Sequence, residues 1–166
     1  DTLSIGICNG CQLMVELGLI YPEQAEMPKM LHNDSHKFES GFINVTIQPN
    51  DSVMLKSLAG ARLGVWIAHG EGKFYFPYAE SEYAIPVKYS YDVYPANPNG
   101  SPFAAAAICS KDGRHLAIMP HTERAIFPWN WPYYAEGRET DEVSPWIEAF
   151  VNARKWVEAH TTGKDR

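Results

Sequence analysis

The first twenty residues show two hydrophobic patterns in succession. Residues 3–7 alternate in a way that is typical of a short strand. From Cys11 to Gly18 the apolar residues recur at helical spacing, and Gly18 is a suitable residue for the end of a helix. Residues 8–10 between them leave room only for a sharp turn. The pattern therefore predicts a strand, a tight turn and a helix, which together make an α/β unit.

Further along the chain, apolar runs alternate with segments that are rich in glycine, proline and polar residues. These runs predict strands at 42–48, 63–68, 83–91, 103–109 and 116–119. The last two are joined through Asp112-Gly113, a pair that favours a hairpin turn. We expect loops at 21–41 and 92–102, where polar residues and prolines interrupt the pattern.

Capping residues indicate two further helices. Asp51 suits the N-cap of a short helix over 51–58, and Ser144 with Pro145 suits the start of a last helix. Apolar residues on one face of that last helix are Trp146, Phe150, Ala153 and Val157. We expect an α/β fold with a single domain over residues 1–160 and a frayed tail at 161–166.

Composition narrows the possible partners and compartment. The chain has 166 residues, a net charge of −6 and 14 Lys and Arg that form no run, which disfavours a nucleic-acid partner. No apolar stretch approaches membrane-spanning length, so no membrane partner is expected. Three cysteines are an odd number, which favours a reducing, cytoplasmic compartment. Because a strand begins almost at once, at Leu3, we expect a fragment of a longer protein.

The segment Gly6-Ile7-Cys8-Asn9-Gly10 has the form of a nucleophile elbow with cysteine as the nucleophile. Glycines two positions away on either side are expected to relieve steric crowding at a strained turn. The helix N-terminus is expected to stabilise a Cys8 thiolate and lower its pKa. The backbone N–H of Asn9 is expected to bind an oxyanion.

Two alternatives compete with a catalytic Cys8. One is a buried structural cysteine in a glycine turn. The other is a redox dithiol, because Cys8 and Cys11 have C-x-x-C spacing. Cys11 is also explained as a small apolar residue on the inner face of the helix.

A histidine and a glutamate favour catalysis. His121 and Glu123 follow the strand at 116–119, and residues two apart in extended chain share a face, so Glu123 can hold the His121 ring. His121 can then serve as the acid–base partner of a thiol. His69 follows another strand and opens a glycine-flanked loop, where it either lines the pocket or is an ordinary loop residue. No Cys/His cluster has the spacing of a metal site.

At this point four motifs resemble a known family. They are G-I-C-N-G-C-Q (6–12), A-H-G-E-G (68–72), N-P-N-G-S (97–101) and M-P-H-T-E-R (119–124). In combination they resemble the glutaminase domain of phosphoribosylformylglycinamidine synthase, over residues 3–157. The resemblance implies a flavodoxin-like class I glutaminase sheet flanked by helices. The aromatic segment 127–131 resembles the large single-chain form, in which the glutaminase is C-terminal.

The resemblance also assigns roles in catalysis. Cys8 would attack the carboxamide of glutamine and form a thioester. His121 would protonate the departing ammonia and then activate water, and Glu123 would orient His121. Asn9 and Gln12 would belong to the oxyanion- and glutamine-binding part of the pocket.

The remaining implied roles concern the pocket loop and the parent enzyme. His69, Gly70 and Glu71 would complete the glutamine-binding pocket. Ammonia would pass to a synthetase domain of the same polypeptide, for ATP-dependent amidation of formylglycinamide ribonucleotide in purine synthesis. The resemblance implies no cofactor in this domain, since ATP and Mg²⁺ act in the synthetase domain.

The sequence departs from the family pattern in two places. Thr122 replaces the usual proline, with little expected effect. The strands that normally precede the nucleophile strand are missing, together with a loop that supplies a second oxyanion donor. Removing one such donor costs roughly a hundredfold to a thousandfold in rate. We therefore expect this chain alone to be a weak or inactive glutaminase with an exposed apolar sheet edge.

Two other functions remain open. The first is another cysteine hydrolase that uses the same kind of elbow. The second is a docking module without activity, because residues 129–134 are unusually rich in aromatic side chains. We expect about half of that segment to belong to the core and part of it to face a synthetase domain.

Overall fold

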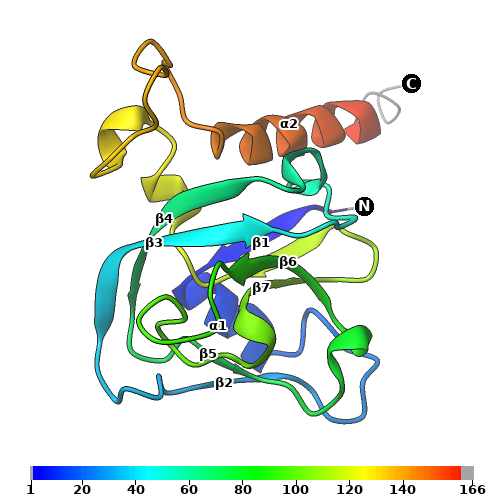
Figure 1. Cartoon of the computed structure of the whole chain (residues 1–166). Helices are drawn as coiled ribbons and strands as arrows, with labels where there is room; N and C mark the ends of the chain where they lie inside the picture. The colour runs from blue at the N-terminus through cyan, green and yellow to red at the C-terminus, as the bar shows by residue number, and fades with distance from the viewer. Residues whose placement is uncertain (1, 162–166) are drawn as a thin grey trace.

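The protein is described by a computed structural model that covers residues 2–161. Six strands form one mixed sheet in the order β1-β8-β7-β6-β3-β4 (Figure 1). Their bounds are Ser4–Ile7 (β1), His115–Ile118 (β8), Ala105–Cys109 (β7), Ala84–Tyr89 (β6), Glu39–Ile47 (β3) and Arg62–His69 (β4). Only β1 and β8 are parallel, and the other neighbours are antiparallel.

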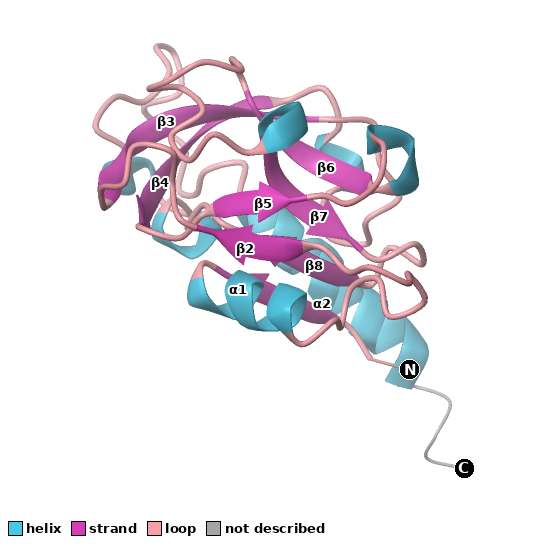
Figure 2. Cartoon of the chain, turned by 90° about the horizontal axis from the view of Figure 1, so that it is seen from below, coloured by secondary structure: helices cyan, strands magenta, loops and turns pink. Residues whose placement is uncertain are grey.

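Two smaller groups of elements complete the fold. Strands β2 (Lys29–Leu31) and β5 (Lys73–Tyr75) form a separate antiparallel pair that lies near α1 (Figure 2). The α-helices are α1 (Asn9–Glu16) and α2 (Ile147–Thr161). Short 3₁₀ turns occupy Lys56–Leu58, Glu80–Glu82, Pro102–Ala104, Thr122–Arg124 and Pro128–Asn130. The α/β prediction is confirmed, although the sheet is mostly antiparallel.

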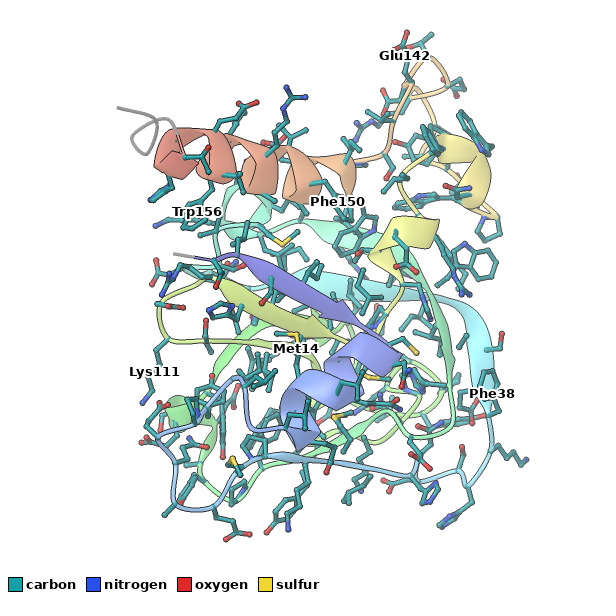
Figure 3. The ribbon with its side chains drawn as sticks, turned by 180° about the vertical axis from the view of Figure 1, so that it is seen from behind. Met14, Phe38, Lys111, Glu142, Phe150 and Trp156 are labelled. Carbon is teal, nitrogen blue, oxygen red and sulfur yellow. The ribbon has the colours of Figure 1, made fainter. Side chains whose placement is uncertain are left out.

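The two helices cover opposite faces of the sheet, and each face has its own apolar core (Figure 1). Strand β8 divides its side chains between them with the two-residue period of extended chain. Leu116 and Ile118 join the core under α2, whereas Ala117 and Met119 join the core under α1. Phe150 and Trp156 extend from α2 toward the sheet (Figure 3).

Strand β1 is an edge of the sheet within residues 2–161. Beside it lies an open, largely apolar pocket of about 520 Å³, lined by residues of β1, α1 and the start of β8. Leu13, Leu17 and Leu19 are 55–67% exposed on this side of the chain. An apolar edge of this kind is what the missing-strand prediction requires.

Several predicted elements differ from the structure because long-range pairing decides them. The predicted loop at 21–41 contains β2 and the first residues of β3, which pair with strands much later in the chain. The predicted helix at 51–58 is wrong: the segment is mostly turn, with a 3₁₀ turn only at Lys56–Leu58. The Oδ1 of Asn50, rather than Asp51, accepts the nearby Ser52 N–H, at 2.9 Å.

The predicted hairpin and last helix are found. Strands β7 and β8 pair antiparallel, and Gly113 takes a positive φ of 74° in the turn between them. Ser144 Oγ accepts the N–H of Trp146 at 3.3 Å, just before α2 begins at Ile147. Thr161 is the last residue of α2, and the rest of the predicted frayed tail, 162–166, lies outside the described residues.

Candidate active site

Cys8 lies on a strained turn between β1 and α1. Its φ of 51° and ψ of −105° are unusual for a residue with a side chain, and this geometry places it ahead of the first helical turn. A Cβ at Gly6 would come within 2.5 Å of the Gly10 carbonyl oxygen and of Met14 Sδ, so only glycine fits there. A Cβ at Gly10 would meet nothing within 4 Å. The prediction that both glycines relieve crowding is therefore right for Gly6 and wrong for Gly10.

The Cys8 thiol is half-buried, and burial changes its chemistry. Desolvation raises the pKa of Cys8 above its ordinary value, and the Glu123 charge adds to the rise. The Asn9 N–H and the Arg124 charge oppose it without reversing it. The predicted lowering of the pKa is therefore wrong, because the desolvation cost exceeds the help from the helix N-terminus. A protonated resting thiol also agrees with the 3.5 Å contact in which Sγ–H donates to the Ala68 carbonyl.

His121 and Glu123 form the pair that their spacing predicts. His121 Nδ1 lies 2.6 Å from Glu123 Oε1, and the His121 residue is only 8% exposed. This bond leaves Nε2 as the ring nitrogen that can exchange a proton with a nearby thiol. Arg124 Nε lies 3.6 Å from the same Glu123 oxygen, on the solvent side of the pair.

Three strand ends bring these residues together. The Cys8 N–H donates to the Ile118 carbonyl at 2.9 Å, which fixes the end of β1 against the end of β8. The His121 N–H donates to the Trp66 carbonyl at 2.8 Å, which ties the segment after β8 to β4. Ala68 on β4 accepts from Cys8. The nucleophile and its predicted acid–base partner therefore gather where β1, β8 and β4 end.

The predicted glutamine-binding residues also meet across the fold. Gln12 on α1 donates its Nε2–H to the Glu71 carbonyl at 2.7 Å, although the two are far apart in sequence. Gly70 and Glu71 follow β4 directly, whereas the Glu71 carboxylate turns outward, 3.5 Å from His32 Nδ1. The contact supports the grouping of α1 with this loop, which the sequence motifs suggested.

His69 is not an ordinary loop histidine. It is the last residue of β4, it is 2% exposed, and its Nδ1 lies 3.2 Å from Asn33 Oδ1. Burial lowers the pKa of His69 to about 4, so the ring is neutral at physiological pH. Asn33 was missed by sequence reasoning because its segment, 21–41, looked like an undistinguished polar loop.

The aromatic segment after the catalytic pair divides as expected. Trp131 packs edge-on against Phe42 and Tyr134 and donates its Nε1–H to the Ala125 carbonyl at 2.8 Å. Trp129 is 73% exposed and stacks on its neighbour near the surface. One part of this segment therefore stabilises the fold, and the other faces solvent.

Other kinds of site have little support in the structure. Within residues 2–161 no group of three or more His, Cys, Asp or Glu is arranged to hold a metal ion. None of the helices described is both long and apolar enough to cross a membrane. Cys11 is completely buried beneath α1, and burial raises the pKa of its thiol, which disfavours the redox-dithiol alternative.

The sequence was also compared with known proteins. Residues 1–157 match the family described as CobB/CobQ-like glutamine amidotransferase domain. A probable phosphoribosylformylglycinamidine synthase, chloroplastic/mitochondrial, from Arabidopsis thaliana is 46% identical over 96% of this chain and 13% of that protein. Phosphoribosylformylglycinamidine synthase from Homo sapiens is 42% identical over 95% of this chain and 14% of that protein. The chain therefore spans only a small part of these relatives.

Solved structures give the same grouping. PurLQS from Thermotoga maritima superposes with a TM-score of 0.69 at 25% identity, over 93% of this chain and 62% of that chain. A GMP synthase protein from Thermoplasma acidophilum, 12% identical, shares the fold with a TM-score of 0.57 over 98% of this chain and 60% of that chain. The chain belongs to the family of glutamine amidotransferase domains, and it is similar to the part of phosphoribosylformylglycinamidine synthases that carries this domain.

Proposed function

We propose that the chain is the glutaminase portion of a phosphoribosylformylglycinamidine synthase. The single observation that carries this proposal is the placement of Cys8 and the His121–Glu123 pair at the neighbouring ends of β1 and β8. The similarity to named synthases selects this family among cysteine enzymes with the same kind of elbow.

In the first half of the reaction, His121 takes the proton of the Cys8 thiol. Sγ then forms a bond to the carboxamide carbon of glutamine, and the carbonyl oxygen becomes an oxyanion that accepts a hydrogen bond from the Asn9 N–H. His121 returns the proton to the departing nitrogen as the carbon–nitrogen bond breaks. The products of this half are ammonia and a thioester on Cys8.

In the second half, water attacks the thioester carbon while His121 accepts one of its protons. The carbon–sulfur bond then breaks, the thiol regains the proton, and glutamate leaves. Glu123 keeps the ring oriented and stabilises the imidazolium in both halves. Because the pKa of Cys8 is raised by burial, the first proton transfer depends on His121 rather than on a preformed thiolate.

Glutamine would be held by Gln12 and by the loop that follows β4. Gln12, Gly70 and Glu71 lie next to one another through the 2.7 Å contact between Gln12 and the Glu71 carbonyl. His69 lies behind this loop, buried and neutral. The backbone carbonyls and N–H groups of such a loop match the ammonium and carboxylate ends of an amino acid.

The ammonia would serve the ATP- and Mg²⁺-dependent amidation of formylglycinamide ribonucleotide in a synthetase domain of the parent polypeptide. Under this proposal the chain itself needs no cofactor, and its partners are glutamine and that synthetase domain. The exposed Trp129 and Tyr133 are candidates for the contact with it. We place the protein in the cytoplasm, in keeping with its three free cysteines, although the Arabidopsis relative is named as an organellar protein.

Labelling with the diazoketone analogue of glutamine tests the proposal. Its terminal carbon forms a thioether with the Cys8 sulfur as N₂ leaves, so reaction requires both the nucleophile and a glutamine site. We expect one label per chain, at Cys8, and none in Cys8→Ala. Cys109→Ala is the matched control, since Cys109 is a buried free thiol on β7.

Competition by substrate separates the proposal from its rivals. Free glutamine should slow the labelling, whereas asparagine should not. Labelling that glutamine does not slow would favour a different cysteine hydrolase. A chain that is never labelled at Cys8 would favour a docking module.

A further inference from the structure

Three segments that are far apart in the sequence meet behind the loop at residues 69–72. They are residues 33–37, residues 69–74 and residues 97–101, and the last of these is the N-P-N-G-S motif. The Asn33 N–H donates to the Gly70 carbonyl at 2.9 Å, and the Asp34 N–H donates to the Asn99 carbonyl at 3.2 Å. The loop is therefore held from behind by segments that do not themselves belong to the catalytic elbow.

Asn33 lies at the centre of this arrangement and is completely buried. Its Nδ2 donates to the His69 carbonyl at 2.8 Å and to the Lys37 carbonyl at 3.0 Å. Its Oδ1 accepts the Gly72 N–H at 3.0 Å and faces His69 Nδ1 at 3.2 Å. The side chain thus uses its full donor and acceptor capacity, most of it on the two ends of the 69–72 loop.

These contacts also determine how the amide and the imidazole are oriented. The Gly72 N–H can only donate and the His69 carbonyl can only accept, so the amide oxygen and nitrogen of Asn33 cannot be exchanged. His69 must therefore donate through Nδ1, which leaves Nε2 unprotonated. Nε2 is buried and has no hydrogen-bond partner within residues 2–161. The neutral ring is a fixed wall of the loop rather than a second acid–base group.

The N-P-N-G-S motif supports the far end of the same loop. Ser101 Oγ accepts the Phe74 N–H at 3.0 Å and donates to Asn99 Oδ1 at 2.7 Å. Gly100 has a φ of 75°, and a Cβ there would come within 2.1 Å of Asp34 Oδ2, so the two supporting segments touch only because this residue is glycine. The motif has no described contact with Cys8, which indicates a structural purpose directed at the loop.

We propose that Asn33 is a positioning residue that fixes the 69–72 loop in its glutamine-binding shape. It holds the ends of the loop so that the Glu71 carbonyl faces Gln12. It makes no described contact with Cys8, His121 or Glu123. Its loss should therefore weaken the recognition of glutamine and leave the reactivity of the thiol unchanged. The inference rests on the proposed glutaminase function.

Two reagents that attack the same thiol separate these effects. Iodoacetamide is small and needs only the Cys8 thiol, whereas the diazoketone analogue also needs the glutamine site. In Asn33→Ala we expect analogue labelling to slow by about tenfold or more, the loss typical of leaving buried partners unpaired. The iodoacetamide rate should stay within about twofold, since Asn33 does not touch the thiol.

Matched variants keep the test decisive. Asn152→Ala removes another side-chain amide, which donates to the Met54 carbonyl and Ser57 Oγ beside α2, and should leave both labelling rates unchanged. Ser101→Ala removes the milder support at Phe74 and should show the same selective loss at smaller size. It carries the test if thermal unfolding shows that Asn33→Ala does not fold.

The possible outcomes distinguish the inference from the function on which it rests. Unchanged analogue labelling in a folded Asn33→Ala, or in Ser101→Ala where that variant carries the test, would overturn the inference. Equal slowing with both reagents in the folded variant would overturn it as well, because the loss would then be one of general structure. A wild-type chain that the analogue does not label at all would instead overturn the proposed function.

Discussion

The crowding at Gly6 gives a prediction that distinguishes two glycines with identical roles in the sequence motif. In Gly6→Ala the new Cβ would lie 2.5 Å from the Gly10 carbonyl oxygen and 2.5 Å from Met14 Sδ. Met14 can change its rotamer, but the carbonyl belongs to the first turn of α1 and cannot move alone. Since carbon–oxygen contacts are normally about 3.3 Å or longer, β1 and α1 must separate by about 0.8 Å.

This separation should cost both stability and activity. Overpacking of this kind typically lowers the free energy of unfolding by about 1–3 kcal/mol. For a domain of this size, each kcal/mol lowers the melting temperature by about 2–4 °C. The elbow also carries Cys8, and a displacement of about 1 Å at a reacting group can slow its reaction by about a hundredfold. We therefore expect a lower melting temperature together with labelling by the diazoketone analogue that is about tenfold to a hundredfold slower.

Gly10→Ala is the matched control. Its Cβ would meet nothing within 4 Å, and alanine is favoured over glycine in a helix by about 1 kcal/mol. Thermal unfolding and the labelling rate of the 166-residue chain should both stay close to the wild-type values. Equal damage from the two substitutions, or a harmless Gly6→Ala, would refute the steric argument.

Three further predictions follow from burial. Because burial lowers the pKa of His69 to about 4 from an ordinary value near 6.5, the unfolded chain binds a proton more readily between these values. The free energy of unfolding should therefore fall by up to about 3 kcal/mol from pH 6.5 to pH 4, measured in urea, with a shallower slope in His69→Gln. Alkylation of Cys8 by iodoacetamide should have a midpoint above the ordinary thiol pKa, and a midpoint below it would contradict the burial argument. Trp131→Ala should lower the free energy of unfolding by about 3–5 kcal/mol because the ring packs against Phe42, whereas Trp129→Ala should change it by about 0.5 kcal/mol or less.

The catalytic residues could be predicted from the sequence because their signals are local. The Cys8 elbow needs only a strand, a tight turn and a helix in succession, and each leaves a short-range pattern. The His121–Glu123 contact needs only two residues of spacing in extended chain. The hairpin through Gly113 follows from turn chemistry. The proximity of Gln12 to Glu71, by contrast, was indicated only by motifs shared with a family.

The tertiary structure decided what depends on neighbours distant in the sequence. Strands β2 and β5 are too short to have a period of their own, and each exists because the other pairs with it. Asn33 gained its place through contacts with a loop more than thirty residues away. The pKa of Cys8 has the opposite direction to the prediction, because the helix N-terminus is visible in the sequence and the burial of the thiol is not.

The sequence by itself therefore determined which residues can react: a cysteine on an elbow with a histidine and a glutamate as partners. Only the tertiary structure decided how those residues are surrounded, which includes the raised pKa of Cys8, the neutral His69 and the crowding at Gly6 but not at Gly10. The physical reason is that bond spacing and turn geometry act over a few residues. Desolvation and steric contact depend on atoms that folding brings together from anywhere in the chain.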